Sequence, residues 1–102
     1  MAGMRPDRLL RRGDLVQCRI EVSHDLGRLV VRLAGRLSEA HVAAFLELCA
    51  GEGLPPRIEL DELVSADAVG LDALLRVEKR GAELVGLAEY LRFKLDDLAR
   101  AP

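Results

Sequence analysis

The spacing of apolar residues divides the chain into short segments of two kinds. Residues 16–22 alternate apolar and polar side chains, and residues 28–34 place Leu29, Val31 and Leu33 at every second position. Alternation of this kind is typical of strands with one buried face. Residues 23–27 separate the two segments with turn-forming side chains, and Gly27 can adopt a positive φ there. The pattern therefore predicts an antiparallel hairpin.

Three later segments show the helical period instead. The first follows Ser38, a favourable N-cap, and the second follows Asp67, which we expect to accept a backbone N–H at the start of its helix. The third covers residues 89–98, where Phe93 lies at the edge of the apolar stripe or outside it. Such a ring either completes the core, which is the favoured expectation, or belongs to an apolar contact patch. The residues expected to face the core are Val42, Phe45, Leu46 and Cys49, then Leu71, Leu74 and Leu75, then Tyr90, Leu91, Leu95 and Leu98.

Two further strands complete the expected fold. Residues 57–60 alternate and are followed by an acidic turn, and residues 82–87 form the last strand. The order is ββαβαβα, which predicts an α/β single domain with a four-stranded mixed sheet. Because the strands alternate, we expect the helices to pack mainly on one face and the other face to stay open. The expected domain covers residues 15–98, with a flexible tail at 1–14 and a short tail at 99–102.

Composition narrows the classes of function. The chain has 102 residues and a formal net charge of −2, so its charge does not favour nucleic acid as a partner. It has no apolar run of membrane-spanning length, so direct membrane insertion is not expected. Arginines at the N-terminus lack the apolar centre of a secretory signal, and a cytoplasmic location is expected. Cys18 and Cys49 are far apart in sequence and are expected to be reduced, buried thiols.

The residues that could carry chemistry form no catalytic or metal-binding set. Asp61 and Glu62 are neighbouring carboxylates, but no nucleophile or glycine-rich phosphate loop accompanies them, so they indicate a solvated turn. His24 and His41 lack other ligands at metal spacing and are expected at the surface. No catalytic residue, metal ligand or cofactor is therefore predicted, and the chain is not expected to be an enzyme.

One ordered set of residues resembles a known family. Gly35 ends the hairpin, Asp61 follows the third strand, and Asp67, Gly70 and Leu71 begin the next helix. This order is similar to that of STAS domains, which are named for sulphate transporters and anti-sigma-factor antagonists. The resemblance covers residues 15–98 and implies a STAS-like fold. It further implies a non-catalytic bacterial module that acts in signal transduction and transcription regulation through protein–protein interaction.

The resemblance also implies a binding site and a missing switch. In antagonists of this family, a kinase that is also the anti-sigma factor phosphorylates the Ser after the motif Asp. Ala68 occupies that position here and has no hydroxyl, so the usual phosphorylation cannot occur at this residue. Ser65 is nearby and is expected to hydrogen-bond the turn backbone. The expected partner-binding loop and helix contain Ser65, Asp67, Ala68, Val69, Gly70, Leu71 and Asp72.

Three functions remain open from the sequence. The first is an interaction module for a kinase-like anti-sigma factor or a larger regulatory assembly. The second is a small cytoplasmic subunit docked on the ATPase of a lipid-transporting ABC complex. The third is a domain that binds a nucleotide or small anion at the N-terminus of a helix. The chain lacks a phosphate-binding glycine run, which disfavours the third function. A homodimer is compatible with each of them.

Overall fold

The computed structural model describes residues 18–51 and 53–100, in which the predicted order of elements is confirmed. The predictions for residues 1–17 and 101–102 lie outside the described residues. The elements are β1 (Cys18–Asp25), β2 (Arg28–Leu37), α2 (Glu39–Cys49), β3 (Arg57–Ala66), α3 (Ala68–Lys79), β4 (Glu83–Val85) and α4 (Glu89–Arg100).

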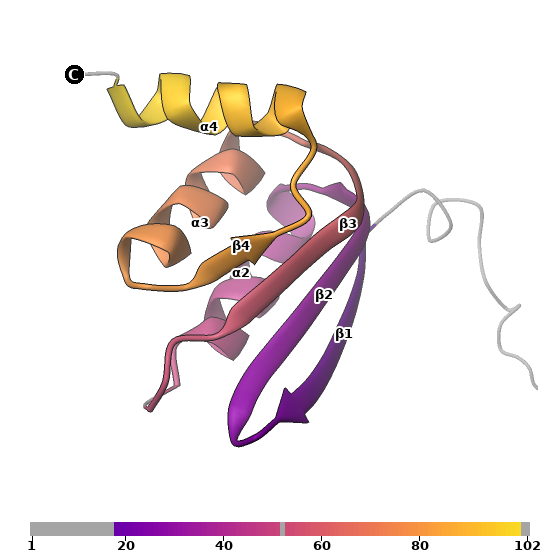
Figure 1. Cartoon of the computed structure of the whole chain (residues 1–102). Helices are drawn as coiled ribbons and strands as arrows, with labels where there is room; N and C mark the ends of the chain where they lie inside the picture. Colours follow the sequence, from indigo (N-terminus) through magenta and orange to yellow (C-terminus); the bar gives the residue numbers. More distant parts are fainter. Residues whose placement is uncertain (1–17, 52, 101–102) are drawn as a thin grey trace, which may run out of the picture.

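The four strands form one mixed sheet, as expected, and their order in the sheet is β1-β2-β3-β4. β1 and β2 are antiparallel, whereas β2, β3 and β4 are parallel. The two parallel connections run in the same direction across the sheet, and connections of the same hand place their helices on the same face. Figure 1 shows α2 and α3 together on that face, with α4 beside α3 at one end of the molecule.

The core lies between the sheet and the helices. Leu33 of β2, Phe45 of α2, Ile58 of β3 and Leu74 of α3 are completely buried. Full burial of one such side chain contributes about 1.5–3 kcal/mol to folding. Leu95 of α4 joins the same cluster, so every helix contributes to it. The strand faces predicted for β2 and β3 are therefore confirmed.

The hairpin turn is tighter than expected. β1 continues to Asp25, which pairs directly with Arg28, so only Leu26 and Gly27 form the turn. Their φ angles are +53° and +81°. Two positive φ values are the requirement of a type I′ turn, whose twist fits that of the adjoining strands. Leu26 therefore adopts a conformation that is uncommon for a residue with a side chain.

β3 is much longer than predicted, and the prediction of an acidic turn after residue 60 is wrong. β3 continues through Asp61 and Glu62 to Ala66. It contains two register shifts against β2. The first, between Glu59 and Glu62, lets Leu60 and Leu63 both face the core although an odd number of positions separates them. The shifts interrupt the alternating pattern, which is why the sequence indicated a turn.

The apolar stripe of α4 is narrower than predicted. Leu91 and Leu95 are buried, whereas Tyr90 is 52% exposed and Leu98 is 36% exposed. Phe93 is 66% exposed, so the prediction that it completes the core is wrong. α4 lies at one end of the molecule, where one row of side chains is enough to cover the core (Figure 1). The helix also continues to Arg100, beyond the expected end at residue 98.

The other face of the sheet is open and charged. Glu21, Arg32 and Glu59 occupy paired positions on three neighbouring strands. Arg32 donates two hydrogen bonds to Glu59, at 2.9 and 3.2 Å. Arg57 lies 3.6 Å from Asp25 across the sheet. Opposite charges therefore alternate on this face, as the prediction of an open face requires.

Candidate functional site

The segment that carries the family resemblance is a direct junction between β3 and α3. β3 ends at Ala66 and α3 begins at Ala68, so Asp67 is the only residue between them. β2 and β3 are parallel, and the helices that follow them begin at the same edge of the sheet. The expected loop is therefore a single capping residue at a place where the N-termini of α2 and α3 are neighbours.

The Asp67 carboxylate caps both helices. Its Oδ1 accepts a hydrogen bond of 2.7 Å from the backbone N–H of Gly70, which confirms the predicted cap of α3. Its Oδ2 accepts a hydrogen bond of 3.1 Å from the backbone N–H of Glu39, the first residue of α2. Backbone N–H groups at helix starts need such acceptors. One carboxylate therefore fixes the relative position of two helix starts.

Ser38 contributes less to this arrangement than predicted. It occupies the N-cap position of α2, but its side chain makes no capping hydrogen bond. Its hydroxyl lies 3.2 Å from Nδ1 of His41. The cap of α2 comes instead from Asp67, which is distant in sequence.

Gly70 is required by close packing between α3 and β2. A Cβ atom placed on Gly70 would lie 2.5 Å from the backbone oxygen of Leu37, a separation that atoms cannot adopt. The same oxygen accepts a hydrogen bond of 3.1 Å from the backbone N–H of Asp67. Gly70 therefore serves close backbone packing.

This geometry leaves no basis for an anion site at the start of α3. The two oxygens of Asp67 already occupy the position that a phosphate or carboxylate ligand would take at these helix N-termini. An external anion would also be repelled by the charge of Asp67. The nucleotide-binding function considered from the sequence therefore loses its structural support.

The predicted partner-binding residues differ in accessibility. Asp67, Ala68 and Val69 are exposed at the start of α3, while Gly70 is buried. Leu71 and Asp72 are half-buried. Ser65 lies within β3, where it pairs with Arg36, so its expected place in a turn is wrong. Of these predicted residues, Asp67, Ala68 and Val69 are the most accessible to a partner.

An apolar surface continues from α3 onto α4. Sequence reasoning considered a contact patch at Phe93 as the less favoured alternative, but did not connect it with α3. A groove of about 300 Å³ has Ala68, Leu71, Phe93 and Leu98 among its lining residues. Val69, in the same first turn of α3, is 42% exposed. We call these five residues the α3–α4 surface. The position of Phe93 outside the helical stripe was the signal that could have identified it.

Polar contacts hold α4 in place beside α3. Arg92 donates hydrogen bonds of 2.8 and 3.0 Å to the two carboxylate oxygens of Glu78 in α3. The hydrogen bonds to Glu78, and then to Asp96, raise the pKa of Arg92 above its ordinary value. Tyr90 donates its hydroxyl proton to the backbone oxygen of Val64 in β3. The α3–α4 surface is therefore formed by two helices that are tied together.

The remaining charged candidates lie apart from this surface. Asp61 and Glu62 are exposed on β3, and the Asp61 carboxylate packs against Gly86, where a Cβ would lie 2.4 Å from it. His24 is exposed, whereas His41 is half-buried and not at the surface as predicted. Within residues 18–51 and 53–100, no group of three or more His, Cys, Asp or Glu is arranged to hold a metal ion. None of the helices in these ranges is long and apolar enough to cross a membrane.

The two cysteines are free thiols, and each is only half-buried. Burial raises the pKa of the Cys49 thiol to about 11, although the nearby charge of Arg80 lowers it in part. Burial also raises the pKa of Cys18, against a smaller lowering by a hydrogen bond with the backbone of Ala34. Both thiols are therefore poor nucleophiles near neutral pH.

Comparison with solved structures found a similar protein. This chain is similar to an antisigma-factor antagonist, a STAS domain from Rhodobacter sphaeroides, with a TM-score of 0.49 and 23% sequence identity. The match covers 68% of this chain and 86% of that chain. No protein-family model matches the sequence. No curated protein matches it either.

Proposed function

We propose that this chain is a non-catalytic STAS-type interaction module that binds a regulatory protein through the α3–α4 surface. The observation that carries this proposal is the exposure of large apolar side chains beside the residues of the STAS-like motif. Val69 is 42% exposed and Phe93 is 66% exposed. Grouped apolar residues next to a groove favour a protein partner over solvent.

The support beneath this surface suits a binding role. Asp67 fixes the start of α3 through two hydrogen bonds, and Arg92 joins α4 to α3. A surface that is rigid before binding loses little conformational entropy when a partner arrives. The apolar residues of α3 and α4 are therefore presented in a preorganised arrangement.

The proposed module lacks the serine phosphorylation switch of the family. Ala68 is exposed at the first position of α3, directly beside the Asp67 carboxylate. A phosphate on a serine at this position would add negative charge at the edge of the α3–α4 surface. With alanine there, we propose that partner binding is controlled by another route. The candidate partners remain a kinase-like anti-sigma factor, a regulatory assembly or a transporter ATPase.

A matched pair of substitutions tests this function. The tagged chain is purified from its host, the bound protein is identified by mass spectrometry, and its affinity is then measured with purified components. We expect Val69→Glu to weaken binding at least about tenfold, because a charge would enter the apolar contact. Glutamate in the first helical turn suits the helix dipole, so folding should be retained.

Val22→Glu is the control for this experiment. Val22 on β1 is 45% exposed, which is close to the exposure of Val69, but it lies outside the α3–α4 surface. We expect the control variant to bind as the wild type does. Equal binding by the two variants would overturn the proposed site.

A further inference from the structure

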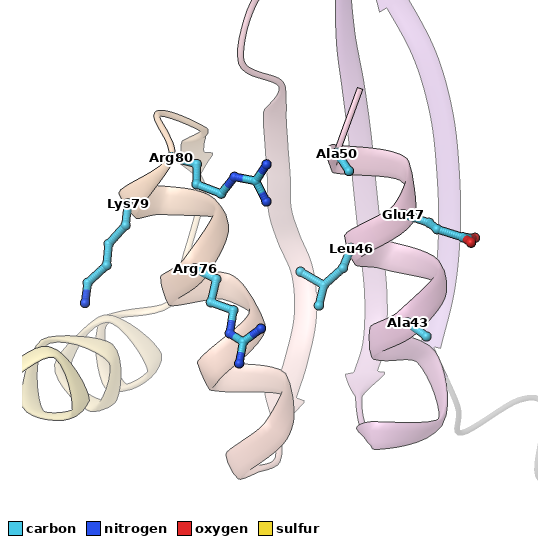
Figure 2. A pocket seen from close by; sticks show the side chains of 7 residues that line it. All are labelled: Ala43, Leu46, Glu47, Ala50, Arg76, Lys79 and Arg80. Carbon is cyan, nitrogen blue, oxygen red and sulfur yellow. The ribbon is translucent and has the colours of Figure 1, made fainter. Parts of the chain in front are cut away.

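A second groove lies on the other flank of α3, between α2 and α3. Its volume is about 560 Å³, and its lining comes from α2 and from the C-terminal part of α3. Figure 2 shows this groove, with α4 on the far side of α3. It is therefore separate from the α3–α4 surface.

The side of the groove formed by α2 is apolar. Figure 2 shows Leu46 pointing from α2 towards α3, with Ala43 and Ala50 at neighbouring positions along the helix. The alanines leave space that larger side chains would fill. Glu47, the acidic lining residue, points away from the groove. A partner that enters here meets hydrocarbon on the α2 side.

The side formed by α3 is basic. The guanidinium group of Arg80 points into the space between the helices, whereas Arg76 runs along α3 at the edge of the groove and Lys79 points away (Figure 2). Nε of Arg76 lies 2.9 Å from a carboxylate oxygen of Asp72. In the part of the chain that the structure describes, Arg80 has no carboxylate within salt-bridge distance. Basic residues at a helix C-terminus suit the helix dipole, but the dipole does not require Arg80 to point into a neighbouring groove.

We propose that the α2–α3 groove binds an acidic amphipathic helix of a partner protein. Arg76 and Arg80 are four residues apart on α3, about 6 Å along its axis. Two glutamates four residues apart on a partner helix have the same spacing and can meet both guanidinium groups. A leucine between them would contact Leu46, as in other helix-in-groove complexes. This second surface is independent of the function proposed for the α3–α4 surface.

Charge and composition favour a protein over nucleic acid here. The chain has a net charge of −2, so it has no general attraction for a polyanion. Arg32 and Arg57 on the open sheet face are paired with carboxylates. The exposed aromatic rings, Tyr90 and Phe93, lie on α4 and not beside the groove, so bases have no stacking platform there.

The test uses the full chain and two synthetic peptides. Each is a capped, alanine-rich peptide of about 18 residues, with leucine flanked by two glutamates in one peptide and by two glutamines in the other. Nitrogen-15 NMR spectra record which backbone amides shift during titration. We expect the glutamate peptide to shift amides of α2 and of the C-terminal half of α3, and to bind more tightly than the glutamine peptide.

Arg76→Gln combined with Arg80→Gln should weaken the glutamate peptide roughly fivefold to tenfold. Arg100→Gln is the matched control, because Arg100 is an exposed helix-terminal arginine outside the groove, and it should leave affinity unchanged. Equal affinity for the two peptides would overturn the proposal, as would shifts confined to α4. A single-stranded oligonucleotide that binds more tightly than the glutamate peptide, and depends on both arginines, would instead assign the groove to nucleic acid.

Discussion

The partial charges of the helix dipole are balanced differently at the two ends of α3. At the N-terminal end, one internal carboxylate at Asp67 neutralises the partial positive charge and also caps α2. At the C-terminal end, Arg76 and Arg80 balance the partial negative charge with side chains that line an open groove. At the first end, the charged group makes short hydrogen bonds to backbone N–H groups. At the second end, the charged groups belong to solvent-exposed side chains.

This difference separates the structural role of a charge from its availability for binding. Asp67 has both carboxylate oxygens engaged with its own chain, so its charge serves the fold first. The guanidinium of Arg80 is exposed to solvent, so it breaks no contact within the chain when it pairs with an acidic group, and its desolvation penalty is small. Substitutions at the N-terminal end should therefore lower mainly the free energy of unfolding. Substitutions at the C-terminal end should lower mainly the affinity for a partner.

The largest expected effect comes from Gly70→Ala. The added Cβ would lie 2.5 Å from the backbone oxygen of Leu37, so α3 must move away from β2. Alanine is the better helix former, but overpacking at backbone contact outweighs this gain. We expect the free energy of unfolding to fall by about 1–3 kcal/mol, measured by urea denaturation.

Gly51→Ala provides the control for this substitution. A Cβ on Gly51 would meet no atom within 4 Å. The control should be neutral or slightly stabilising, because alanine reduces the freedom of the unfolded chain. If both variants unfolded at the same urea concentration, the close packing of α3 against β2 would not contribute to stability.

Asp67→Ala should have the next largest effect. Gly70 and Glu39 would both lose their acceptor, and we expect a loss of about 1 kcal/mol in the free energy of unfolding. Asp72→Ala is the matched control on the same helix, because Asp72 forms an i,i+4 ion pair with Arg76 that is exposed to solvent. A smaller loss for Asp67→Ala than for Asp72→Ala would contradict the double cap.

The sequence predicted those parts of the molecule that depend on local pattern. The hairpin, the order of elements and the cap from Asp67 to Gly70 each follow from residues that are close in sequence. The cap from Asp67 to Glu39 joins residues 28 positions apart and could not be inferred from spacing. The contact of Gly70 with the backbone oxygen of Leu37 likewise joins residues that are distant in sequence.

The errors have two physical causes. In β3, the register shift that lets Leu60 and Leu63 share a face also interrupts the alternation from which strands are predicted. In α4, the helical period correctly identified Leu91 and Leu95 but could not indicate how wide a stripe the core would cover. Tyr90 and Phe93 are exposed because α4 packs at one end of the molecule, which is a tertiary property.

A smaller effect is expected from Ala68→Ser. Ala68 is exposed at the first position of α3, and the free energy of unfolding should change by less than about 0.5 kcal/mol. The variant supplies the hydroxyl of the motif that this sequence resembles. If the partner proposed above is a kinase, it should phosphorylate the variant while leaving the wild type unmodified. Phosphate found by mass spectrometry at Ser65 of the wild-type chain would show that the switch has moved and not been lost.

The smallest expected effect concerns Arg80 and the nearby thiol of Cys49. Burial raises the pKa of Cys49 to about 11, and the charge of Arg80 opposes this rise. Arg80→Gln should therefore raise the pKa further and slow alkylation by iodoacetamide at pH 8.5 by about twofold. Cys18 is the internal control, because its pKa is set by burial and the backbone of Ala34. Faster alkylation of Cys49 in the Arg80→Gln variant would mean that the Arg80 side chain covers the thiol in the wild type. Arg80 would then pack against α2 and would not be free to bind an acidic partner.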